Sequence, residues 1–269
     1  MTRVSLGEIT IGYDDRGSGP PLLLVHGHPF DRSMWGPQLE HFAAAGWRVV
    51  APDLRGYGES TVVPGKTPLA TFAGDLAALL DHLGLDRAVL CGLSMGGQIV
   101  LEFQRLFADR VRGLVLADTF ARAETTEGRK VRNATADRLL REGMAGYAEE
   151  VLTKMVSPEN ARTQPWVADH VLTMMRGAHP EGAAAALRGR AERPDYVGLL
   201  PRIAVPALVV VGRDDELTPV GDARLLHERI PGAKLAVVEG AAHLPNLERR
   251  AAFNRVLAGF LEGVFTSIG

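Results

Sequence analysis

The segment Ala88–Gln98, with the sequence AVLCGLSMGGQ, decides the fold of this chain. Its first four residues are apolar and predict a short buried strand, and apolar residues resume at helical spacing over Ile99–Phe103. Between them, Gly92, Ser94 and Gly96 fit the pattern G-x-S-x-G of a sharp strand-to-helix turn. This turn needs both glycines, because a Cβ at either position would collide with the neighbouring strand or helix. It would expose the Ser94 hydroxyl above the sheet, beside the free N–H groups that begin the helix.

Composition excludes several classes of protein. The 269 residues suffice for one large α/β domain, or for a domain with an insertion. A formal net charge of −2 gives no sign of a nucleic-acid surface. The single cysteine, Cys91, excludes disulfide frameworks and cysteine-based zinc sites. The first residues lack the apolar segment of a signal peptide, and no apolar run reaches the ~18 residues of a membrane span, so we expect a cytoplasmic protein without a membrane partner.

The rest of the chain alternates strand and helix patterns around this central segment. Further strands are expected at 4–13 (as an antiparallel hairpin), 21–25, 48–51, 111–118, 207–211 and 234–239, and helices at 33–45, 71–83, 220–229 and 249–264. This alternation predicts a mostly parallel, doubly wound sheet.

One segment departs from the alternation. Residues 121–201 show no strand pattern, only helical stretches broken at Gly143, Pro158, Pro165 and 177–180. We therefore expect an α/β core formed by residues 1–120 and 202–269, with a helical lid, or cap, formed by residues 121–201.

Two later loops carry residues that complete a catalytic set with Ser94. Asp215 follows the seventh predicted strand and His243 follows the eighth. Because the carboxyl ends of parallel strands meet at one edge of the sheet, we expect these side chains to gather there. A free hydroxyl is a poor nucleophile near neutral pH, and a histidine can take its proton and later return it. A carboxylate holds that histidine in the required tautomer.

The acid of this set has alternatives. Asp215 is favoured by the spacing G-x-x-D-x-x-T-P, but Asp214 adjoins it and Asp118 ends the sixth strand, from which a carboxylate could reach the same histidine. Otherwise Asp214 would be a solvated charge of the loop, and Asp118 a carboxylate that caps a helix or stabilises a turn. No metal-ligand spacing such as H-E-x-x-H occurs, so neither a metal nor an organic cofactor is predicted.

Five motifs in order resemble the α/β-hydrolase superfamily over essentially the whole chain. They are the G-x-S-x-G turn, the acid loop 212–219, the histidine loop 240–243, the segment HGHP at 26–29 and the segment DLRGYGES at 53–60. The sequence GLSMGG at 92–97 together with HGHP is similar to the cofactor-free haloperoxidase and aryl-esterase branch. The tail GAAHLPNLE at 240–248 is more similar to the 3-oxoadipate enol-lactonase branch.

The resemblance implies further roles by position. The backbone N–H groups of His28 and Met95 would form the oxyanion hole, and the peptide between His28 and Pro29 would be cis. A titratable side chain at position 28 is unusual among relatives, and it either contacts the substrate or packs under the lid. His26 is expected to support this loop, and Asp53 and Arg55 to act as a structural clamp of their turn.

The lid should select the substrate. Its positive and negative residues nearly balance, and no cluster predicts a carboxylate-binding pocket. Its larger side chains line an adaptable apolar cavity or belong to the helix cores. These side chains are Met144, Tyr147, Met155, Trp166, Met174 and Met175.

The sequence thus predicts a serine hydrolase, a monomer or homodimer, that cleaves a small to medium, largely apolar carboxylic ester or lactone through an acyl-enzyme. Three alternatives use the same fold. A hydrolase of carbon–carbon bonds in ring-cleavage products can use the same triad. A cofactor-free perhydrolase would resemble the haloperoxidase branch, and a receptor would bind a small molecule without turnover.

Overall fold

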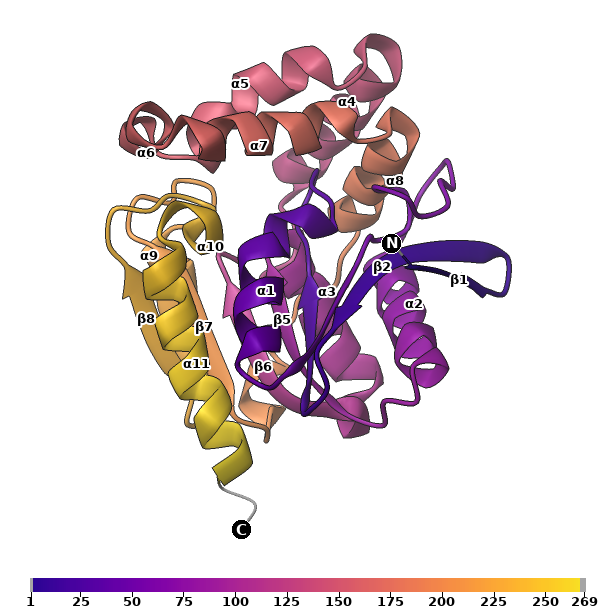
Figure 1. Ribbon diagram of the computed structural model, residues 1–269. Helices are drawn as coiled ribbons and strands as arrows, with labels where there is room; N and C mark the ends of the chain where they lie inside the picture. Colours follow the sequence, from indigo (N-terminus) through magenta and orange to yellow (C-terminus); the bar gives the residue numbers. More distant parts are fainter. Residues whose placement is uncertain (1, 267–269) are drawn as a thin grey trace.

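The computed structural model describes residues 2–266 and is built around one twisted sheet (Figure 1). Its strands lie in the order β1-β2-β4-β3-β5-β6-β7-β8, with β1 and β2 antiparallel to their neighbours and every other pairing parallel. The strands are β1 (Thr2–Leu6), β2 (Ile9–Arg16), β3 (Pro21–Val25), β4 (Arg48–Pro52), β5 (Ala88–Leu93), β6 (Val111–Ala117), β7 (Ala207–Gly212) and β8 (Lys234–Val238). The predicted parallel sheet with an antiparallel hairpin at its edge is confirmed.

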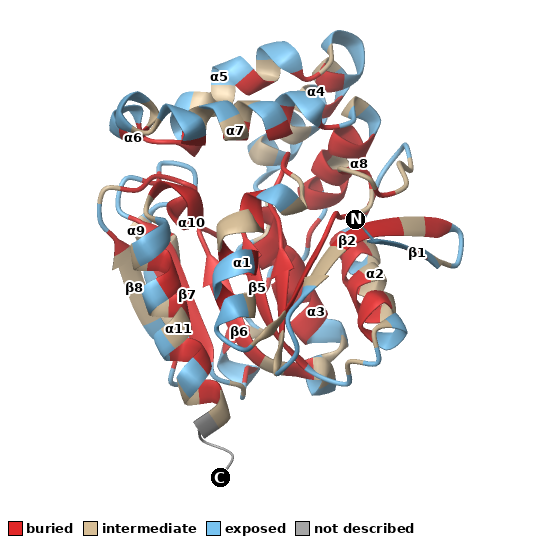
Figure 2. Ribbon diagram, viewed as in Figure 1, coloured by how far each residue is buried: buried red, intermediate tan, exposed pale blue. Residues whose placement is uncertain are grey.

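Helices cover both faces of the sheet. Helices α1 (Gly36–Ala44) and α11 (Arg250–Thr266) pack on one face, and α2 (Leu69–His82), α3 (Met95–Leu106) and α9 (Val220–Arg229) on the other. Strands β5 and β7 are buried along their whole length (Figure 2), because helices screen them on both faces. This burial explains why both strands are continuous apolar runs in the sequence.

Five α-helices separate β6 from β7 in the sequence, where no strand was expected. They are α4 (Thr126–Glu142), α5 (Ala145–Met155), α6 (Pro158–Thr163), α7 (Pro165–Gly177) and α8 (Pro180–Ala191). Gly143 ends α4 at a φ of 75°, and prolines begin α6, α7 and α8, where their missing N–H is no loss. Figure 1 shows these helices lying together across one end of the sheet.

Short elements complete the chain and modify two expected helices. The helix expected over 33–45 is split into the 3₁₀ helix η1 (Arg32–Trp35) and α1, because Asp31 caps the first turn and Pro37 starts the second helix. The remaining short elements are η2 (Ala108–Arg110), η3 (Leu200–Arg202) and α10 (Pro245–Glu248). None of the helices within residues 2–266 has the length and apolar character needed to cross a membrane.

Candidate active site

Ser94 lies at the sharp turn between β5 and α3, in a conformation that few non-glycine residues adopt. Its φ is 57° and its ψ is −115°. A Cβ at Gly92 would overlap the Gly96 backbone, and one at Gly96 would overlap the carbonyl oxygen of Val25. The backbone of Ser94 is fixed by its own N–H, which donates to the Ala117 carbonyl at 2.9 Å. The glycine spacing therefore has the steric cause expected from the sequence, and strain of this kind is typical of functional sites.

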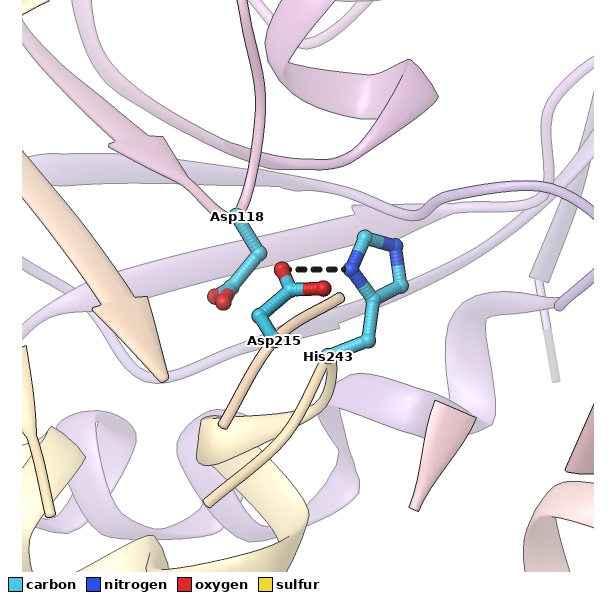
Figure 3. Close-up of side chains that lie close together, drawn as sticks. All are labelled: Asp118, Asp215 and His243. Atoms are coloured by element: carbon cyan, nitrogen blue, oxygen red, sulfur yellow. Dashed lines mark hydrogen bonds and ion pairs between the residues drawn. The ribbon is translucent and has the colours of Figure 1, made fainter. Parts of the chain in front are cut away.

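His243 and Asp215 form a buried hydrogen-bonded pair at the same end of the sheet (Figure 3). The His243 Nδ1 to Asp215 Oδ2 distance is 2.8 Å, which is usual for N–H···O. Asp215 also accepts from the Leu217 N–H at 2.8 Å, and from the backbone and hydroxyl of Thr218. Burial alone would raise the pKa of Asp215, but His243 and the donors of Thr218 outweigh it and lower the pKa. Asp215 is therefore held ionised beside the imidazole.

The other two candidate acids have different surroundings. Asp214, adjacent in sequence, is exposed. Asp118 is fully buried beside Asp215, at a φ of 44°, and its Oδ1 accepts from the Gly212 N–H at 2.8 Å (Figure 3). Its Oδ2 has no hydrogen-bond partner among residues 2–266. Burial, followed by the charge of Asp215, raises the pKa of Asp118 well above its ordinary value.

This cluster also has the composition of a possible cation site. Asp118, Asp215 and His243 each offer one ligand atom, and these atoms lie within 4.8 Å of one another. An imidazole with carboxylates is a donor set that metals use. Here, however, the imidazole and one carboxylate already face each other at hydrogen-bond distance.

His28 lies in the loop after β3, next to Ser94. An added Cβ on the preceding residue, Gly27, would lie 3.2 Å from the Ser94 Cβ, so this loop packs against the turn. The peptide between His28 and Pro29 is cis, as the resemblance implied. The His28 Nδ1 lies 2.8 Å from the Tyr57 hydroxyl, whereas its buried Nε2 has no partner in the described part of the chain. Burial, and then the charge of Arg190, lowers the pKa of His28 well below its usual value.

Neighbouring residues support this loop without entering the cavity. The His26 Nε2 accepts the Leu54 N–H at 2.9 Å, and its Nδ1 lies 2.9 Å from the Gly27 carbonyl oxygen. The expected structural roles of Asp53 and Arg55 are met by separate ion pairs. Asp53 pairs with Arg32, and Arg55 pairs with Asp75.

A cavity of about 350 Å³ joins these groups to the helices between β6 and β7. Ser94, His28 and His243 line one side of it. The other lining residues are Phe120, Glu124, Gly128, Val131, Arg132, Thr135, Tyr147, Val151, Lys154, Met155, Leu187, Arg190, Leu217 and Thr218. Apolar side chains such as Phe120, Val151 and Leu187 share this lining with polar and charged ones, and the size suits a small ligand.

The structure decides between the two interpretations of the large lid side chains, and it adds a feature that the sequence did not indicate. Tyr147 and Met155 line the cavity, but four other candidates do not: Met144, Met174 and Met175 are packed in the helix cores, and Trp166 is 44% exposed. The cavity also has cationic residues, which the balanced charge of this segment did not indicate. They are Arg132, Lys154 and Arg190, against the single acid Glu124.

Comparisons with known proteins identify the family of this fold. Residues 22–256 match the model of the Alpha/beta hydrolase family. A solved thermophilic esterase from Thermogutta terrifontis, with malate bound, superposes with a TM-score of 0.96 at 40% identity, covering 98% of this chain and 99% of that one. A 3-oxoadipate enol-lactonase of Acinetobacter baylyi is 29% identical over 96% of this chain and 94% of its own length. A bromoperoxidase from Bacillus anthracis is 26% identical with a TM-score of 0.86, covering 97% and 99% of the two chains.

Proposed function

The chain belongs to the alpha/beta hydrolase family, and from this premise we propose that it is a serine hydrolase that cleaves a small to medium carboxylic ester or lactone through an acyl-enzyme. One observation carries the proposal: Ser94 at its strained turn lines the same cavity as His243, and His243 is hydrogen-bonded to the buried Asp215. The similarity to an enol-lactonase and to an esterase supports the substrate class.

Each member of this set has a defined task in the proposed reaction. Ser94 attacks the acyl carbon while His243 takes the hydroxyl proton and then gives it to the leaving oxygen. Asp215 accepts the Nδ1–H of His243, which leaves Nε2 as the base and stabilises the imidazolium that forms. Water then attacks the acyl-enzyme with His243 again as the base, which releases the acid and restores Ser94.

The oxyanion that develops in both steps needs donors beside Ser94. Met95 is the first residue of α3, so its N–H is one of the free donors at the positive end of the helix dipole. The loop of His28 packs against Ser94 from the other side. We assign the backbone N–H groups of these two residues as the oxyanion hole, which in other acyl-transfer enzymes is worth about 3–4 kcal/mol per donor.

The helices between β6 and β7 are assigned the role of a cap over the site. Cavity residues such as Tyr147, Val151 and Met155 belong to α5, and Leu187 and Arg190 to α8. In this scheme residues 121–201 choose the substrate, whereas the core formed by residues 1–120 and 202–269 performs the chemistry.

A fluorophosphonate probe tests the proposal directly, because it labels a serine only where a neighbouring base activates it. The wild-type chain and the variant S33A, which removes an exposed serine outside the cavity, should both be labelled, and S94A should not. S94A should also lose turnover of p-nitrophenyl esters and an enol-lactone while keeping its Tm. Turnover by S94A near the wild-type rate would refute the role of Ser94, and an unlabelled wild-type chain would favour a receptor.

A further inference from the structure

Arg190 of α8 is a buried cation without an acidic partner. The residue is 6% exposed, and its Nε donates to the neutral amide oxygen of Gln98 at 3.1 Å. Within residues 2–266, no Asp or Glu forms an ion pair with it. Its neighbours Arg132 and Arg193, by contrast, both pair with Glu124. A buried charge is expected to be paired, so the missing partner of Arg190 calls for an explanation.

Further positive charges surround Arg190. Burial, and then the charges of Arg132 and Arg193, lower the pKa of Arg190, although a guanidinium stays protonated in proteins. Its side chain lines the cavity of Ser94. Glu124 is the one acidic residue of that lining and already accepts from two arginines. The cavity therefore holds positive charge that no described side chain neutralises.

His28 adds a neutral donor to the same cavity. The Tyr57 hydroxyl is fully buried, and the His28 Nδ1 is its hydrogen-bond partner in the described chain. Because a buried O–H needs an acceptor, Tyr57 donates to Nδ1, which then carries no proton. The remaining proton of the neutral imidazole lies on Nε2, which is buried and has no partner within residues 2–266.

We propose that the ester or lactone carries a second functional group, a carboxylate, that is bound by the guanidinium of Arg190 and the Nε2–H of His28 while Ser94 attacks the acyl carbon. This inference rests on the proposed hydrolase function and narrows its substrate to monoesters or lactones of small dicarboxylic acids. The planar fork of an arginine matches the two oxygens of a carboxylate. A neutral ester oxygen could accept one hydrogen bond, but it would leave the charge of Arg190 unbalanced.

Pairs of substrates that differ only in this charge test the proposal. The kcat/KM values of monomethyl succinate, glutarate and adipate are compared with those of the corresponding dimethyl esters. The wild-type chain should prefer the monoanion for at least one chain length. In R190Q the monoanion-to-diester ratio at that length should fall about 30-fold or more, because a desolvated charge pair that loses one partner weakens by at least this factor.

Three variants separate binding from structure. R188Q removes a half-buried arginine of the same helix that pairs with Asp137 outside the cavity, and its ratio should match that of the wild type. R190K keeps the charge without the fork, so its ratio should lie between those of wild type and R190Q. H28F removes the imidazole donor but keeps an aromatic ring, and its ratio should fall by about tenfold.

Binding of the free acids supplies a readout that does not depend on turnover. Succinate, glutarate or adipate should raise the Tm of S94A, and this shift should vanish in the double variant S94A/R190Q. The proposal is overturned if the diester is preferred at every length, or if R190Q lowers both kcat/KM values by the same factor. Failure of the underlying hydrolase function is a different result, in which wild type cleaves neither ester and Ser94 is not labelled by fluorophosphonate.

Discussion

Replacing Asp118 with Asn tests whether Asp118 is a protonated neighbour of the proposed catalytic acid, Asp215, or is that acid itself. Asp118 is buried beside Asp215, accepts one hydrogen bond from the Gly212 N–H, and has one oxygen without a partner in the described structure. Its raised pKa keeps it neutral where Asp215 is ionised. Asn has the same shape, can accept the same N–H and carries no charge. We therefore expect D118N to fold and to keep most of the activity.

The magnitude follows from proton linkage. In the unfolded chain a carboxyl ionises near pH 4, whereas the folded chain keeps the Asp118 proton up to its raised pKa. At pH values between these two pKa values, the native state of the wild type binds one more proton than the unfolded state. Its free energy of unfolding then falls by about 1.4 kcal/mol per pH unit as the pH rises. D118N lacks this contribution, so its free energy of unfolding relative to that of the wild type should rise with pH through this range.

Urea unfolding of both chains at pH 5, 6 and 7, at constant ionic strength, measures this difference. The same samples supply kcat/KM, with D215N as the comparison. D215N should lose on the order of 10³–10⁴-fold in kcat, because an amide opposite Nδ1 holds the wrong tautomer of His243. A stability difference that does not change with pH would refute the protonated state of Asp118. A loss in D118N as large as that expected for D215N would move the catalytic acid to the end of β6.

Two further predictions concern steric fit. M155A should shift the preferred acyl chain towards longer homologues in a chain-length profile. The shift should be graded, because one methylene is worth only ~1–3 kcal/mol in an apolar pocket. M174A removes the same atoms outside the cavity and should leave the profile unchanged. G96A should lose the native fold or drop steeply in Tm, because its Cβ would overlap the Val25 carbonyl oxygen. G146A, whose Cβ meets no neighbour, should keep both the fold and the Tm. An unchanged Tm in G96A would contradict the steric argument.

The sequence was sufficient to predict the fold for identifiable physical reasons. Strands covered on both faces, such as β5 and β7, must be apolar throughout, so continuous apolar runs marked them. Gly143 marked the end of α4 because a glycine readily adopts the positive φ found there, and prolines marked the starts of α6 and α7 because a proline is tolerated in the first turn of a helix but not further along. The predicted α/β-hydrolase fold and superfamily are confirmed by the family match and by the superposed structures.

The site was only partly predictable, because adjacent residues can differ entirely in environment. Sequence spacing favoured Asp215 over Asp214, and in the structure the former is buried against His243 whereas the latter is exposed. The position of Asp118 at the end of its strand indicated that it could reach the same histidine, but no sequence pattern indicated that it would lie there as a neutral acid beside Asp215. The charge of the cavity could not be predicted either, because a balanced total charge does not show which cation lacks a partner. Most lid arginines form ion pairs, such as Arg138 with Glu142 and Arg176 with Glu149, whereas Arg190 does not.

The two histidines of the cavity show how one site can hold two different proton chemistries. His243 faces a carboxylate that is kept ionised, and in the proposed acyl transfer this carboxylate would stabilise the imidazolium. His28 faces Tyr57 and lies in the field of Arg190, and both its burial and this charge lower its pKa, so it stays neutral. Its Nδ1 is occupied by the Tyr57 hydroxyl, which leaves Nε2–H as a hydrogen-bond donor. When two residues of one type have such different surroundings, the surroundings indicate which role each residue can take. On this argument the same positive charge that would bind the substrate carboxylate also keeps His28 from competing with His243 for the serine proton.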